Sequence, residues 1–206
     1  MNLDLKKLII FDLDGTLVNS DLTVLNIINS MRKKRNLQSI DIREAKDGLL
    51  MGGEGLINDL IGNYDVKKTL NEFRENYLNC NLDKENLFPY VLESLKLLKS
   101  KNIKLAVCTN KPRALVEKVL YHHKINFFFD IVITGCDVKK KKPDPEGLIK
   151  IFNFFKLNVN DVLFIGDSEI DFQASKRANV NFVLFNPNKE NSEHLNFDSY
   201  LNFFKA

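Results

Sequence analysis

The chain has 206 residues, 44% of them hydrophobic and 28% charged, and its 30 basic and 27 acidic side chains give a formal net charge of +3. This length and composition are typical of one globular domain, or of one domain that carries a smaller insertion. They exclude a collagen, a disulfide-stapled scaffold and a wholly disordered chain. Because the charges are interspersed and nearly balanced, they indicate neither a nucleic-acid partner nor a membrane surface.

The cysteines and the apolar segments predict a compartment. Cys80, Cys108 and Cys136 lie far apart, with no Cys pair or Cys/His cluster, which argues against zinc and favours a reducing environment. The apolar run near the amino terminus is too short for a signal peptide. No segment approaches the roughly 20 apolar residues of a membrane span. We therefore expect a cytoplasmic protein.

The first predicted element is a buried strand over residues 7–11, an apolar run that ends at Asp12-Leu13-Asp14-Gly15. Only helical patterns follow until residue 87, at 22–34, 54–61 and 66–82. Between two of these helices, Gly52-Gly53-Glu54-Gly55 predicts a flexible loop. Such a loop serves as a hinge or a substrate contact in one interpretation, and as a plain turn in the other.

Strands and helices alternate in the remainder of the chain. Further apolar runs of four or five residues are continuous and rich in Ile, Val, Leu and Phe, as in parallel strands covered on both faces. They occupy 103–107, 130–133, 162–165 and 181–185, and the helical patterns occupy 90–101, 112–123, 145–156 and 168–179. Pro89, Pro112 and Pro145 stand where first helical turns are expected.

This order predicts an α/β fold, a doubly wound, Rossmann-like parallel sheet. Residues 1–18 and 88–206 form this core, and residues 19–87 form an inserted α-helical cap. Ligands of such sheets bind at the carboxyl ends of the strands, so a cap inserted after the first strand is placed to close over the site.

The most specific motif follows the first strand. Asp12 and Asp14 stand two residues apart, so we expect their carboxylates to point the same way. They are then able to share a divalent cation or to perform two tasks on one substrate. Asp and Gly are also ordinary turn residues, but chance gives five specified residues of the string Asp-Leu-Asp-Gly-Thr-Leu with odds on the order of one in ten thousand.

With these residues in view, the sequence resembles the haloacid dehalogenase-like hydrolases, whose first motif is similar to FDLDGTLVNS. Three further motifs of that family follow in the expected order. They are the hydroxyl-bearing Cys108-Thr109-Asn110-Lys111, the lysine of KKPDPEG at Lys142, and the acidic segment 166–171, which contains Asp167 and Asp171. The resemblance covers nearly the whole chain, and the cap region is its least specific part.

The resemblance implies a phosphatase in which Asp12 is the nucleophile and Asp14 the general acid and base. It also implies Mg²⁺, held by Asp12, the backbone carbonyl of Asp14, and Asp167, because two anions approach a phosphate only when their charge is offset. Asp171 is expected to support these ligands from the same helical face as Asp167.

The phosphate oxygens are expected to bind Lys142, Thr109 and backbone N–H groups near Asn110. Thr109 and Asn110 also suit a simpler role as caps of the following helix. In the run 139–142 we expect Lys142 alone to serve the site and the other three lysines to be solvated.

The motifs favour hydrolysis of a small phosphorylated metabolite and look most like those of phosphoglycolate phosphatases. Pyrophosphatases and nucleotidases share them, so they do not name the substrate. A phosphomutase of the β-phosphoglucomutase kind uses the same two aspartates and remains an alternative. A phosphate-binding module without turnover is a third, although a positioned acid and base such as Asp14 argues against it.

Overall fold

The computed structural model describes residues 6–62, 64–189 and 191–203 and divides into two compact units. One consists of Met1–Val18 with Leu87–Ala206, and the other is the segment Asn19–Asn86. Compared with the predicted boundaries, Leu87 alone changes unit. The boundary passes through two short paired strands, β2 (Val18–Asn19) and β3 (Asn86–Leu87). Residues 1–5, 190 and 204–206 of the predicted core and residue 63 of the predicted cap lie outside the described residues.

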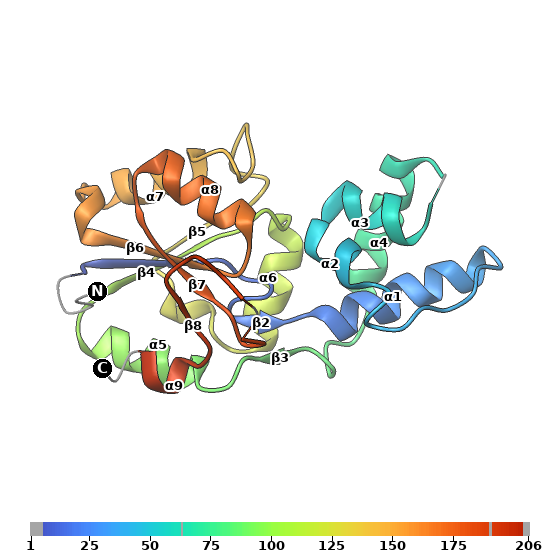
Figure 1. Cartoon of the computed structure of the whole chain (residues 1–206), viewed down its shortest axis with the longest axis horizontal. Helices are drawn as coiled ribbons and strands as arrows, with labels where there is room; N and C mark the ends of the chain where they lie inside the picture. The colour runs from blue at the N-terminus through green and yellow to red at the C-terminus, as the bar shows by residue number, and fades with distance from the viewer. Residues whose placement is uncertain (1–5, 63, 190, 204–206) are drawn as a thin grey trace. The chain divides into compact units, whose positions relative to one another are not determined.

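A six-stranded sheet forms the centre of the first unit (Figure 1), and every neighbouring pair in it is parallel. The strand order is β5 (Ile131–Ile133), β4 (Lys104–Cys108), β1 (Leu8–Phe11), β6 (Val162–Gly166), β7 (Asn181–Phe185) and β8 (Asn196–Phe197). This confirms the predicted doubly wound parallel sheet. The two-residue strand β8 is an addition that the sequence pattern does not indicate, since one of its residues is polar.

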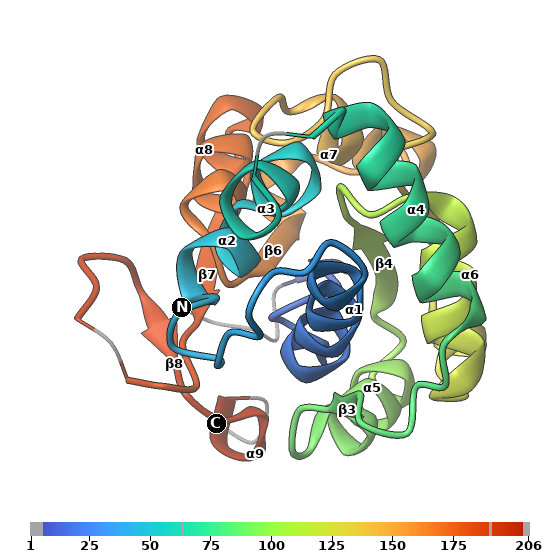
Figure 2. The ribbon, with the colours of Figure 1, turned by 90° about the vertical axis from the view of Figure 1, so that its right-hand side faces the viewer.

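Helices cover both faces of this sheet (Figure 2), which explains why its strands are continuous apolar runs. The helices are α5 (Val91–Ser100), α6 (Arg113–His122), α7 (Glu146–Phe154), α8 (Glu169–Ala178) and α9 (Tyr200–Phe203), and η2 (Asn126–Phe128) and η3 (Val159–Asp161) are 3₁₀ turns. Helices α7 and α8 pack on one face, where Leu8, Ile10 and Phe164 meet Leu148 and Ala174. Helices α5 and α9 lie on the opposite face.

Two of the three prolines stand at helix starts, but each lies just before the first helical residue instead of at it. Pro112 and Pro145 are the residues that cap α6 and α7, so each helix begins just after its proline. Pro89 precedes the capping residue of α5, which is Tyr90 in a left-handed conformation. Asp144 accepts a hydrogen bond from the backbone N–H of Glu146 and so satisfies the first turn of α7.

The second unit is helical, with α1 (Asp21–Lys34), α2 (Lys46–Met51), α3 (Gly53–Leu60) and α4 (Val66–Asn79). Its core contains Ile28, Met31, Ile57 and Phe73. The expected loop at 52–55 is wrong: Gly52 alone separates α2 from α3, and residues 53–55 form the first turn of α3. The positive φ of Gly52, 58°, allows one helix to end and the next to begin within a single residue.

Among the described residues, no helix has both the length and the apolar character that crossing a bilayer requires.

Candidate active site

The candidate site lies where the direction of chain winding reverses in the sheet. From β1 the chain reaches β4 and β5 on one side, and it then crosses to β6, β7 and β8 on the other. Asp12 follows β1 and Asp167 follows β6, and the Asp12 N–H donates to the Ile165 carbonyl at 2.9 Å. Crevices at such reversal points are the usual ligand sites of open α/β sheets.

Three carboxylates converge there. Asp12, Asp167 and Asp171 each place an oxygen within 4.8 Å of the others, so together they could hold a metal ion. Their counter-ion is Lys142, whose Nζ lies 2.6 Å from Asp171 Oδ1 and 3.0 Å from Asp12 Oδ1. The Lys142 side chain is 4% exposed, whereas residues 139–141 are exposed. The lysine run therefore divides as expected.

Burial and mutual repulsion perturb these acids. Desolvation raises the pKa of Asp12 to about 6, against the opposing attraction of Lys142. Desolvation also raises the pKa of Asp167 well above its ordinary value, and the charges of Asp171 and Asp12 add to this rise. Burial alone would lower the pKa of Lys142, but Asp12 and Asp171 outweigh it and raise that pKa.

The chemistry of this donor set fits a hard divalent cation. Three carboxylates face one lysine, which leaves two negative charges when all are ionised, so a divalent cation would complete the neutralisation. Asp12 Oδ1 is buried and has no hydrogen bond of good geometry in the described structure, although the Lys142 ammonium lies 3.0 Å away. An oxygen in that condition is suited to ligate a metal.

Asp171 reaches the cluster in a different way from the one predicted. Asp167 precedes α8, so the two acids share no helical face. Instead Asp171 and Ser168 form a capping box at the start of α8, in which the side chain of each accepts from the backbone N–H of the other at 3.3 Å. Ser168 Oγ also donates to Asp171 Oδ2 at 2.5 Å. This turns the carboxylate back toward Lys142. A Cβ at Gly166 would lie 2.6 Å from Asp171, so this approach requires glycine.

The segment after β4 supports Lys142. The Asn110 side chain donates to the Lys142 carbonyl and accepts from the Lys142 N–H, both at 2.9 Å. Its amide group is thus engaged by the backbone of Lys142. Thr109 is buried, and its Oγ1 accepts from the Lys111 N–H at 3.2 Å. The capping interpretation is wrong, because Lys111 precedes α6 and the capping residue of that helix is Pro112, with no side-chain cap hydrogen bond. The anchoring of Lys142 by Asn110 has no sequence signal.

The Asp14 carboxylate pairs with a different lysine from that of Asp12. It lies 2.7 Å from Lys111 Nζ, outside the acidic cluster. The regular strand ends at Phe11 and the chain turns at Gly15, whose φ is +75°, so the alternation of a strand no longer applies at Asp14. No sequence pattern predicts a role for Lys111.

Gly15 and Thr16 also shape the position of Asp167. Thr16 Oγ1 donates to Asp167 Oδ1 at 3.0 Å. A Cβ on Gly15 would overlap Asp167 Oδ2, so the first motif accepts this carboxylate only with glycine in the turn.

Comparison with known proteins identifies the family. The model of the haloacid dehalogenase-like hydrolases matches residues 9–185 of the chain. The chain belongs to this family. It is 31% identical over 185 residues to phosphoglycolate phosphatase 1 of Pseudomonas aeruginosa, with 85% of this chain and 68% of that protein aligned. The family and this relative make the chain a phosphatase.

Solved structures agree with this assignment. A protein from Haemophilus somnus described as a predicted phosphoglycolate phosphatase superimposes with a TM-score of 0.79 at 29% identity, covering 95% of this chain and 89% of that one. A Thermotoga maritima chain whose description suggests a β-phosphoglucomutase superimposes with a TM-score of 0.77 at 21% identity, covering 97% and 98%. At this identity the second likeness concerns the fold alone.

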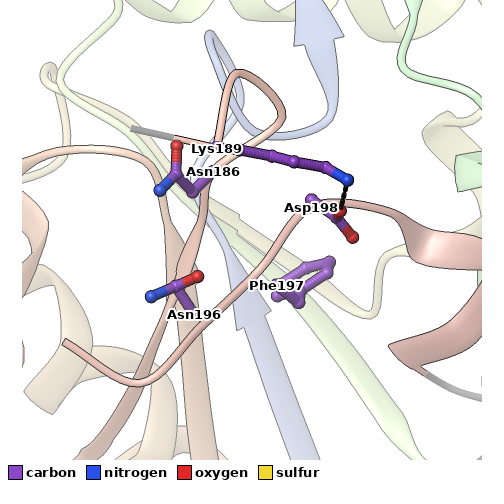
Figure 3. A pocket seen from close by; sticks show the side chains of 5 residues that line it. All are labelled: Asn186, Lys189, Asn196, Phe197 and Asp198. Carbon is purple, nitrogen blue, oxygen red and sulfur yellow. Dashed lines mark ion pairs between the residues drawn. The ribbon is translucent and has the colours of Figure 1, made fainter. Parts of the chain in front are cut away.

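A separate cavity of about 320 Å³ lies beside the ends of β7 and β8 (Figure 3), where the Lys189 side chain extends toward Asp198 and pairs with it at 2.9 Å. Its lining consists of Asn186, Lys189, Asn196, Phe197 and Asp198. A cavity beside Thr109 and Lys142 has only about 10 Å³, room for roughly one water. Chemistry decides between them: the larger cavity has no residue of the family motifs, so catalysis is assigned to the acidic cluster.

Asp167→Asn should stabilise the metal-free protein at pH 8. An acid whose pKa is raised on folding destabilises the folded state above that pKa, and this cost disappears as the pH falls toward its ordinary value of 3.8. In chelator at pH 8 we expect the Tm to rise by about 2–4 °C, equivalent to about 1 kcal/mol. The gain should shrink at pH 5 and when Mg²⁺ is added to both proteins. A lower Tm than wild type at pH 8 would contradict the repulsion argument.

Gly15→Ala should displace Asp167 and reduce turnover at least about tenfold. It should also lower the free energy of unfolding by about 1–2 kcal/mol, because the positive φ of this position is unfavourable for alanine. Gly62→Ala is the matched control, because Gly62 also has a positive φ, of 88°, but no atom of the described residues lies within 4 Å of its added Cβ. Thermal melting and kcat/KM with p-nitrophenyl phosphate measure the two effects. Equal turnover in the two variants would show that the overlap with Asp167 is harmless.

Proposed function

We propose that this phosphatase is a Mg²⁺-dependent phosphomonoester hydrolase that acts on a small phosphorylated metabolite, such as phosphoglycolate, through an aspartyl-phosphate at Asp12. The observation that carries the proposal is the placement of the Asp12 carboxylate beside Lys142 and two further carboxylates at the reversal point of the sheet. Phosphate monoesters hydrolyse extremely slowly unaided, so the site must stabilise much developing charge.

The reaction has two steps. In the first, an Asp12 carboxylate oxygen bonds to phosphorus, the bond from phosphorus to the ester oxygen breaks, and Asp14 gives its proton to the departing oxygen. In the second, water attacks phosphorus, Asp14 takes a proton from that water, and phosphate leaves as Asp12 is regenerated. The alcohol and inorganic phosphate are the products, and no other reactant is consumed.

The charges are offset from two directions. Lys142 lies 3.0 Å from Asp12 Oδ1, so its ammonium is placed to neutralise the nucleophile and the phosphoryl oxygens together. Thr109 and the backbone N–H groups near Asn110 would bind the remaining oxygens. Asp12, the backbone carbonyl of Asp14, and Asp167 would hold Mg²⁺, which supplies Lewis-acid stabilisation of the phosphoryl charge when bound.

Asp171 supports these groups. Its carboxylate is fully buried and pairs with Lys142 at 2.6 Å, so it fixes the ammonium that faces Asp12. Its proximity to Asp167 makes it a neighbour of the cation, but its oxygens are engaged by Ser168 and Lys142.

The substrate is chosen by groups beyond the phosphate. We assign this role to the helical unit 19–86 as a cap, because it is inserted directly after the motif that contains Asp12 and Asp14. Phosphoglycolate is the first candidate because the relative from Pseudomonas aeruginosa is a phosphoglycolate phosphatase. A phosphomutase, a pyrophosphatase and a nucleotidase would use the same core residues.

Asp12→Asn should lower turnover by at least about 10³-fold, because an amide oxygen is a poor nucleophile toward phosphorus. The matched control is Asp198→Asn, which alters a half-exposed carboxylate beside the other cavity and should retain wild-type turnover. Phosphate release measures activity, and circular dichroism confirms folding. Rapid hydrolysis by a folded Asp12→Asn variant would overturn the mechanism.

Turnover should require Mg²⁺ and recover when the ion is restored after chelation. The screen covers p-nitrophenyl phosphate, phosphoglycolate, pyrophosphate, nucleotides and sugar phosphates, ranked by kcat/KM. Asp167→Asn should raise the Mg²⁺ concentration needed for half-maximal activity by about tenfold or more. Isomerisation of glucose 1-phosphate with a bisphosphate primer, without hydrolysis of any ester, would replace the proposal with the mutase.

A further inference from the structure

Lys111 occupies a position that an ordinary surface lysine does not. It lies in the turn between β4 and α6, three residues beyond Cys108. Strands β1 and β4 are neighbours with Phe11 opposite Val107, so this turn and the first motif share one edge of the sheet. The Lys111 side chain is only 9% exposed. A buried ammonium is costly unless it is paired and hydrogen-bonded.

The partner of Lys111 is the proposed acid and base. Lys111 Nζ donates to Asp14 Oδ1 at 2.7 Å, and the Asp14 side chain is 34% exposed. Asp14 precedes the turn at Gly15, beyond the end of β1, so the strand does not fix the direction of its carboxylate. A charge-assisted hydrogen bond from a largely buried donor restricts that direction.

The two lysines of the site therefore serve different aspartates. Lys142 contacts Asp12 and Asp171, and Lys111 contacts Asp14. A proton donor must be held within hydrogen-bond reach of the departing oxygen, and a displacement of about 1 Å is able to cost 10²-fold in rate. We propose that Lys111 is a positioning residue, whose ammonium orients the Asp14 carboxylate for proton transfer to the leaving group.

This inference rests on the proposed phosphatase mechanism and makes a distinct claim about leaving groups. An ester with a good leaving group, such as p-nitrophenyl phosphate, needs little proton donation, whereas phenyl phosphate needs more. The two esters have nearly the same size and lack a second anionic group. Loss of phosphate binding or of general stability would slow both equally, but loss of acid positioning slows phenyl phosphate more.

The test measures kcat/KM for a series of substituted phenyl phosphates with wild type and with Lys111→Met. This constant covers the steps up to departure of the leaving group, so attack by water does not enter it. We expect kcat/KM of the variant to fall about tenfold more on phenyl phosphate than on p-nitrophenyl phosphate. This loss is part of the roughly 10²–10⁴-fold rate enhancement that a general acid contributes. Lys96→Met, at an exposed position of α5, is the matched control and should keep the wild-type dependence.

Asp14→Asn completes the test. If Lys111 acts through Asp14, then Lys111→Met should add no further dependence on the leaving group in the Asp14→Asn background. Circular dichroism establishes folding first. If Lys111→Met does not fold, Lys111→Gln replaces it. Because glutamine retains a hydrogen-bond donor, this variant should show a smaller increase in the dependence of kcat/KM on the leaving group.

The outcomes separate the two claims. Equal losses on all esters, or an undiminished effect of Lys111→Met in the Asp14→Asn background, would overturn the positioning role. Failure of the wild-type protein to hydrolyse any ester would overturn the proposed function instead.

Discussion

The buried ammonium group of Lys142 is the contact on which the arrangement of the site depends. It joins Asp12 to Asp171, two acids from distant parts of the chain, at distances of 3.0 and 2.6 Å. A charge with 4% exposure is tolerated only with such partners. Other residues position this ion pair: Asn110 hydrogen-bonds both backbone groups of Lys142, and Ser168 donates a hydrogen bond to Asp171. The site is therefore a network that joins the ends of β1, β4 and β6.

The same network concentrates negative charge at a cost. Glycine at positions 15 and 166 removes the side chains that would keep Asp167 and Asp171 away from their neighbours. Desolvation, with the charges of Asp171 and Asp12, raises the pKa of Asp167, and desolvation raises that of Asp12 to about 6. A divalent cation would reverse both effects, because it stabilises the ionised carboxylates that repel one another without it. The features that destabilise the cluster are thus the features that would give it affinity for a cation.

The sequence was sufficient for the strands and for the convergence of Asp12 with Asp167, because buried parallel strands are continuous apolar runs whose ends meet at one edge. It was insufficient where a side chain depends on a loop conformation. The Asn110 amide binds the backbone of Lys142, 32 residues away, and no periodicity reports such a contact. Lys111 offered no signal either, since a lysine in a turn is usually solvated. Strand β8 was not predicted, because a strand of two residues is too short to show a hydrophobic pattern.

Asp12 and Asp14 show how one residue type acquires two proposed roles within a single motif. Asp12 directly follows the strand, is 14% exposed and faces Lys142, so its carboxylate is desolvated and fixed. Asp14 lies beyond the regular strand, is 34% exposed and faces Lys111, so it remains accessible to a substrate oxygen and to water. A nucleophile must approach phosphorus from one defined direction, whereas an acid and base must exchange protons with two partners in succession. The end of strand β1, which comes just before Asp12, separates these two environments.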